Sequence, residues 1–163
     1  MIRITPCLWF DGQAEAAANH YLSIFPNSRI TSVLRWGEVG PGPKGSVLSV
    51  AFSLDGNDFV ALNGGAQFKF TEAISLMVPC KTQDEVDQYW EKLSAGGSKG
   101  QCGWLKDKFG VSWQVAPTIL PEMLQDKDSA KADRVMRAMM QMTKIDIGAL
   151  RKAYEGREVG AVA

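Results

Sequence analysis

The side chains that could carry out chemistry are few, and the most versatile of them is a single histidine. His20 is the only imidazole in the 163 residues, so a metal site with several histidine ligands is excluded. On a helical wheel His20 lies opposite a stripe that includes Tyr21 and Phe25, and we therefore expect it to face solvent. A Ser-His-Asp triad built on His20 is accordingly a weak hypothesis.

Three cysteines, Cys7, Cys80 and Cys102, could act as nucleophiles or soft metal ligands. Their odd number and their spacing, with no C-x-x-C pair, argue against both a disulfide framework and a zinc site. Cys102 is the best candidate for a functional role, because the neighbouring Gly103 allows close approach of backbone. A small buried apolar residue is the alternative interpretation of Cys102.

The glycines and carboxylates do not form a nucleotide site. No G-x-G-x-x-G pattern follows an expected strand and opens an expected helix, no G-x-x-x-x-G-K-[ST] pattern is present, and we predict no cofactor. The acidic residues Asp55, Asp84, Glu85 and Asp107 fall at expected helix starts and turns, where carboxylates have structural roles.

Composition narrows the class of protein further. Apolar residues make up 45% of the chain and charged residues 22%, which is ordinary for a globular domain. Eighteen basic residues balance eighteen acidic ones, so no net charge favours nucleic acid or an anionic membrane as a partner. The apolar runs are far shorter than the ~20 residues that span a bilayer, and the first residues lack the regions of a signal peptide. We expect a cytoplasmic protein.

The elements that must position these residues begin with a first module, residues 3–63. An apolar segment at 4–10 predicts a strand, and Asp11 is the expected N-cap of a helix that Pro26 ends. Alternation from Ser28 to Trp36 predicts a second strand. A glycine- and proline-rich loop follows, and then two strands at 48–54 and 59–62 flank the hairpin turn at 55–57.

A second module, residues 73–117, repeats this order. It has a strand at 74–78 and a helix with the capping box Thr82-x-x-Glu85, closed by Gly96-Gly97. Two short strands follow at 101–106 and 111–115. This degenerate repeat predicts an α+β protein of two βαβββ modules in one domain, residues 1–163, since one module alone would expose an apolar sheet face. Helices at 119–124, 130–142 and 145–154 form a C-terminal region, 118–156, which precedes a loose tail at 157–163.

Four runs of sequence resemble a known family: residues 5–17 (TPCLWFDGQAEAA), 73–78 (AISLMV), 83–90 (QDEVDQYW) and 101–114 (QCGWLKDKFGVSWQ). They are similar to PhnB-like proteins, the 3-demethylubiquinone-9 3-methyltransferase domain family of the vicinal-oxygen-chelate (glyoxalase/bleomycin-resistance) superfamily. One departure is Ala66, where a proline is expected after Asn63-Gly64-Gly65. The resemblance implies a mixed-sheet cleft and a homodimer.

The resemblance also implies where a metal would bind. Relatives such as glyoxalase I place one ligand on each of four strands, and these positions correspond to Thr5, Val60, Ala73 and Gln114. Val60 and Ala73 cannot bind a metal and Thr5 is a poor ligand, so we predict no metal site.

Strand alternation predicts which side chains line the cleft. The more apolar face of each strand should cover the helices, and the other face should point into the cleft. The cleft candidates are Cys7, Trp9, Ser49, Ser53, Ser75, Met77 and Gln114. Thr5, Ala51 and Ser112 share the same parity. This uncharged set suits a neutral or weakly polar small molecule.

Three functions remain open. The favoured one is a metal-independent protein that binds a small molecule. The second is an enzyme, either a metal-dependent lyase or dioxygenase of the superfamily or the methyltransferase of the family name. The third is an interaction protein that works through its methionine-rich C-terminal helices. Open strand edges and the apolar residues Trp36, Val135, Met136, Met139 and Met140 add a physical reason to expect a homodimer.

Overall fold

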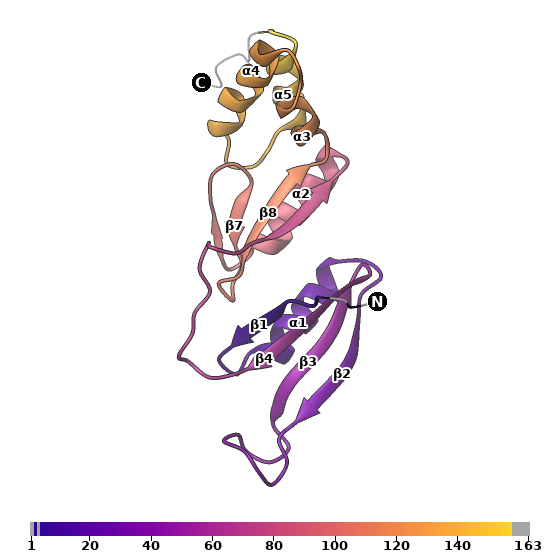
Figure 1. Ribbon diagram of the computed structural model, residues 1–163, viewed down its shortest axis with the longest axis vertical. Coiled ribbons are helices and arrows are strands. Elements are labelled where there is room, and N and C mark those ends of the chain that lie inside the picture. Colours follow the sequence, from indigo (N-terminus) through magenta and orange to yellow (C-terminus); the bar gives the residue numbers. More distant parts are fainter. Residues whose placement is uncertain (1, 3, 158–163) are drawn as a thin grey trace. The chain divides into compact units, whose positions relative to one another are not determined.

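The computed structural model describes residues 2 and 4–157 and contains two compact units, Met1–Phe70 and Thr71–Ala163. Each unit has one four-stranded mixed sheet with a helix against one face, and three more helices follow in the second unit (Figure 1). The predicted α+β class with two βαβββ modules is confirmed. None of the described helices is long and apolar enough to cross a membrane.

The first unit consists of one helix and four strands. These are β1 (Cys7–Phe10), α1 (Ala14–Ile24), β2 (Arg29–Arg35), β3 (Val47–Leu54) and β4 (Asn57–Asn63). The strand order is β1-β4-β3-β2, in which β1 and β4 are parallel and the other pairs antiparallel. A parallel pair needs a crossover connection, and here that connection passes through α1, β2 and β3.

The apolar side chains that alternate along these strands pack one face of the sheet against α1. Phe52 is 1% exposed, and the Tyr21 ring of α1 stacks on it with 6.3 Å between ring centroids. Ala14, Ala17 and Ala18 are fully buried, so the helix lies close to the strands. The predicted hairpin is present, since Asp55 and Gly56 both have positive φ, as a two-residue turn of this type requires.

Two expectations for the first unit are wrong. Asp11 does not cap α1. Gly12, at φ +76°, extends the turn, Gln13 takes the N-cap position without a side-chain bond, and Asn63 Oδ1 accepts from the Ala14 amide at 2.9 Å. The strict alternation predicted for residues 28–36 is also broken, because the pairing of β2 with β3 shifts between Ile30 and Ser32.

The second unit repeats this order with shorter strands. Its elements are β5 (Leu76–Cys80), α2 (Gln83–Ser94), β6 (Ser98–Lys99), β7 (Trp104–Lys106) and β8 (Ser112–Pro117), in the sheet order β5-β8-β7-β6. The predicted cap is present, since Thr82 Oγ1 accepts from the Glu85 amide at 3.2 Å. Residues 101–102 are not a strand as expected, because Cys102 adopts φ +56° and turns the chain.

Three helices complete the second unit: α3 (Ile119–Leu124), α4 (Ser129–Met140) and α5 (Ile147–Tyr154). They enclose a core of their own, formed by Leu120, Met123, Val135, Ile145 and Leu150. Gln83 links α2 to this bundle: its side chain donates to the Ile145 carbonyl at 3.1 Å and accepts from the Ile147 amide at 2.8 Å. The C-terminal helices are thus confirmed with shifted ends, and the tail predicted at 157–163 lies beyond the described residues except for Arg157.

Candidate ligand-binding faces

Each sheet has one face that packs against its helix and one that does not, which we call the open face. On the first sheet the open face carries the predicted residues Cys7, Trp9, Ser49 and Ser53, at positions that alternate with the buried Leu8, Phe10, Val50 and Phe52. Cys7 is exposed, Ser49 is half-buried and Ser53 is buried. Strand pairing adds Val60 and Leu62, opposite Ala51 and Ser49, to the same face.

Trp9 is already engaged by the chain that follows β4. Its indole Nε1 donates to the Gly65 carbonyl at 2.8 Å, and its ring meets that of Phe68 edge-on, with centroids 5.0 Å apart. A Cβ at Gly64 would lie 2.2 Å from the Trp9 ring, so this position requires glycine. The Asn63-Gly64-Gly65 motif therefore holds the indole in place.

The open face of the second sheet brings together the other three predicted residues. Gln114 Nε2 donates to Ser75 Oγ at 2.8 Å, and Met77 is the neighbour of Gln114 in the β5–β8 pairing. Met77 is 65% exposed. An amide, a hydroxyl and a flexible apolar side chain thus form one surface, and the seven candidates divide into two groups, one on each unit.

Sequence reasoning missed the charged residues on this face. Lys106 lies opposite Ser112 in the β7–β8 pairing, and its Nζ is 2.5 Å from Glu72 Oε1. The hydrogen bond to Lys106 is the main cause that lowers the pKa of Glu72. Trp104, opposite Gln114, also shares this face. Extending the alternation rule to residues 104–106 could have identified both Trp104 and Lys106.

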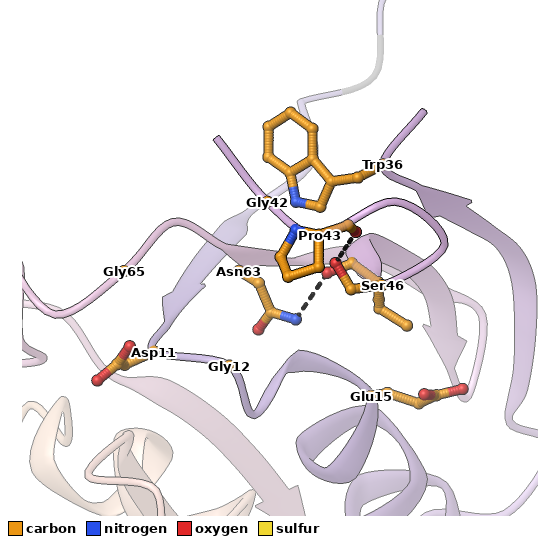
Figure 2. Close-up of a pocket in the computed structure, with 10 residues that line it drawn as sticks. Asp11, Gly12, Glu15, Trp36, Gly42, Pro43, Ser46, Asn63 and Gly65 are labelled. Atoms are coloured by element: carbon orange, nitrogen blue, oxygen red, sulfur yellow. Dashed lines mark hydrogen bonds between the residues drawn. The ribbon is translucent and has the colours of Figure 1, made fainter. Parts of the chain in front are cut away.

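A separate hollow of about 390 Å³ lies on the first unit, between the start of α1 and the loop that joins β2 to β3 (Figure 2). Trp36 forms one wall, packed so tightly on its loop that a Cβ at Gly42 would lie 2.1 Å from the indole Nε1. Asp11 and Glu15 lie at the rim, and the lining has no basic side chain. The glycine- and proline-rich composition of the loop was the only signal for it in the sequence.

Asp107 and His20, both considered for chemistry from the sequence, lie away from these faces, in the interior or partly buried. Asp107, 3% exposed, accepts from the amides of Phe109 and Val111 and from the indole of Trp113, at 2.8–3.0 Å. The run at 101–114, one of the four that resemble the family, thus contains a buried carboxylate that shapes a turn. His20 does not face solvent as expected but is half-buried, with its ring 5.8 Å from that of Tyr21.

The positions that resemble metal ligands do not fit a divalent ion. Val60 and Ala73 offer only hydrocarbon, and the amide oxygen of Gln114 alone would not hold a divalent ion. Within the described part of the chain, no three His, Cys, Asp or Glu residues are grouped so that they could hold a metal.

Comparison with known proteins assigns the family. Residues 2–116 match the family described as 3-demethylubiquinone-9 3-methyltransferase. The chain belongs to this family. Its PhnB-like members have the vicinal-oxygen-chelate fold, as the sequence motifs predicted.

Solved structures agree with this assignment. The PhnB protein of Bacillus cereus is 39% identical, with a TM-score of 0.66 over 72% of this chain and 100% of its own. A Pseudomonas aeruginosa protein (17% identity, TM-score 0.61, 72% and 98% coverage) shares the fold. The fosfomycin resistance protein FosX of Listeria monocytogenes also shares the fold, with 16% identity and a TM-score of 0.53 over 77% of this chain and 98% of its own. No curated protein matches the chain.

Proposed function

We propose that this PhnB-like protein binds a small neutral or weakly polar molecule on the open faces of its sheets, without a divalent metal. The observation that carries this proposal is the Gln114–Ser75 hydrogen bond beside the exposed Met77. Ligand sites combine apolar surface with a few polar groups held in a fixed orientation. The 2.8 Å bond provides that orientation for an amide that still has donor and acceptor capacity for a ligand.

The rest of the two faces supports the same class of ligand. The open face of the first sheet offers the hydroxyl of Ser49, the thiol of Cys7 and the apolar side chains of Val60 and Leu62. On the second sheet the positive charge of Lys106 is balanced by Glu72. Arg29 and Asp58, both opposite Ser53, bring one charge of each sign to the first face, so these charges balance on each face, which favours a neutral molecule.

A thermal-shift screen of neutral metabolites, followed by calorimetric titration of each hit, tests the proposal. We expect at least one metabolite to stabilise the protein, and Gln114→Leu to weaken its binding about tenfold, the loss expected for about one hydrogen bond. Gln88→Leu makes the same chemical change on the exposed side of α2 and should leave affinity unchanged. If only metal ions stabilise the protein, the proposal is wrong.

An enzyme is the second candidate, and the family description favours it. A methyltransferase must bind S-adenosylmethionine, and the glycine-rich loop of this chain joins two strands rather than a strand and the start of a helix. Equilibrium binding of S-adenosylmethionine would support that activity. Elemental analysis of protein purified without chelator tests the metal-dependent lyase or dioxygenase, which requires stoichiometric metal.

We further propose a homodimer in the cytoplasm. Leu34 on the edge strand β2 is 57% exposed, and Met136 and Met140 on α4 are 41% and 60% exposed. Pairing two copies would remove such apolar area from water at ~25 cal/mol per Å². Three free thiols suit a reducing compartment. Sedimentation equilibrium should give twice the chain mass of 17.8 kDa, and a value near 17.8 kDa would rule out the dimer.

A further inference from the structure

The open face of the second sheet holds an internal carboxylate against a lysine. Glu72 precedes β5, whereas Lys106 belongs to β7, and β8 lies between these two strands. The 2.5 Å ion pair therefore spans β8 beside Ser112, the strand partner of Lys106. The Glu72 side chain is 62% exposed, so this carboxylate can leave without any rearrangement of a core.

Beside this ion pair lies the buried hydroxyl of Ser112. Ser112 is 2% exposed, and within the described part of the chain no hydrogen-bonding group reaches its Oγ. A buried hydroxyl without a hydrogen bond costs about 1–3 kcal/mol, so its presence needs an explanation. By strand parity Ser112 points to the same side as Lys106 and Gln114, which places an ammonium, a hydroxyl and an amide on adjacent positions.

We propose that Glu72 occupies the place of a ligand carboxylate, and that an amphipathic carboxylate binds here by displacing it from Lys106. The incoming carboxylate pairs with the ammonium and accepts a hydrogen bond from Ser112 Oγ, which supplies the missing partner. Its apolar part lies along Met77 and Trp104, which flank Gln114 on the two neighbouring strands. This inference rests on the proposed function in using the same face, and it goes beyond it in the ligand class, because displacement of Glu72 uncovers the charge of Lys106 for an anionic molecule.

Hexanoate and its neutral counterpart hexanamide are the probes, with acetate and inorganic phosphate as further arms, all at constant ionic strength. Binding is measured by calorimetry and by amide chemical shifts of β7 and β8. We expect hexanoate to bind more tightly than acetate, phosphate or hexanamide. Glu72→Gln, which removes the internal competitor, should raise hexanoate affinity about two- to fivefold, the range that corresponds to an exposed ion pair.

Matched variants separate this mechanism from a general change in charge. Glu91→Gln breaks the exposed Lys99–Glu91 pair of the same unit, at 2.9 Å, and should leave hexanoate affinity unchanged. Lys106→Met should abolish the preference for hexanoate over hexanamide, whereas Lys106→Arg should retain it. Ser112→Ala should weaken hexanoate binding without creating a preference for hexanamide.

The outcomes distinguish this inference from the proposed function. Equal binding of hexanoate and hexanamide, or equal affinities for wild type and Glu72→Gln, overturns the carboxylate site and leaves binding of a neutral molecule intact. Tighter binding of phosphate than of hexanoate also overturns it, because the site would then recognise charge rather than an amphipathic carboxylate. Failure of the metabolite screen bears on the proposed function alone.

Discussion

The two sheets share a strand order but are stabilised by different interactions. Three of the four strands of the first sheet have seven or eight residues, and its helix is held at the N-terminus by Asn63, 49 residues further along the chain than Ala14. The second sheet includes strands of two and three residues, and its helix is capped locally by Thr82. It also has the buried Asp107 and a bundle of three helices that the first unit lacks.

This difference shows which parts of a repeated module can vary. The hydrophobic alternation is kept in both copies, because it decides which face meets the helix. The polar interactions are not kept, because any donor or acceptor of suitable geometry can satisfy a helix end or a turn. Short strands supply few ladder hydrogen bonds, so we infer that the second unit depends more heavily on its buried carboxylate.

The largest expected effect comes from Asp107→Ala. It leaves two backbone amides and the Trp113 indole without their charged acceptor in a buried site, and we expect a loss of about 3–5 kcal/mol of unfolding free energy. Urea denaturation measures the loss, and hydrogen exchange should locate it in the second unit. Asp107→Asn keeps one acceptor oxygen and should lose less. Equal stability of Asp107→Ala and wild type would show that the second sheet does not depend on this group.

The counterpart in the first unit is Asn63→Ala. Asn63 accepts from the Ala14 amide at 2.9 Å and donates to the Val47 carbonyl at 3.0 Å, so one side chain joins β4, α1 and β3. Removing both bonds should cost about 2 kcal/mol. Hydrogen exchange should show faster opening in residues 4–70 and unchanged protection in the second unit. Faster opening across both units would contradict the separation of the two sets of interactions.

A smaller effect is expected from Thr82→Ala. The Thr82 hydroxyl satisfies one amide at the start of α2, and loss of an N-cap typically costs about 1 kcal/mol. Thr82→Ser keeps the hydroxyl and serves as the control. If Thr82→Ala cost more than Asn63→Ala, the local cap would be the stronger of the two interactions and the comparison would reverse.

These contrasts also explain what could be predicted from the sequence. The helices and the 55–57 hairpin follow from local pattern, and the structure confirms them. The error at Asp11 arose because the group that satisfies the α1 amide lies 49 residues away, where no local rule points to it. Lys106 was missed because the strand was expected to begin at Gln101, whereas the turn at Cys102 delays its start to Trp104. The pairing of Ser75 with Gln114 depends on register between distant strands, which composition does not reveal.

The smallest expected effect is a pH dependence confined to the second unit. Cys80 is fully buried, and burial, with a smaller contribution from Glu85, raises the pKa of its thiol to about 11 from an ordinary value of 9.0. Between these two values the folded state binds more proton than the unfolded state, so stability must fall as pH rises. From pH 8 to 9.5 we expect a loss of about 1 kcal/mol or less. Urea denaturation across this range should show the slope in wild type and in Cys7→Ala, which keeps the buried thiol, but not in Cys80→Ala. A slope that persists in Cys80→Ala would assign it to other groups.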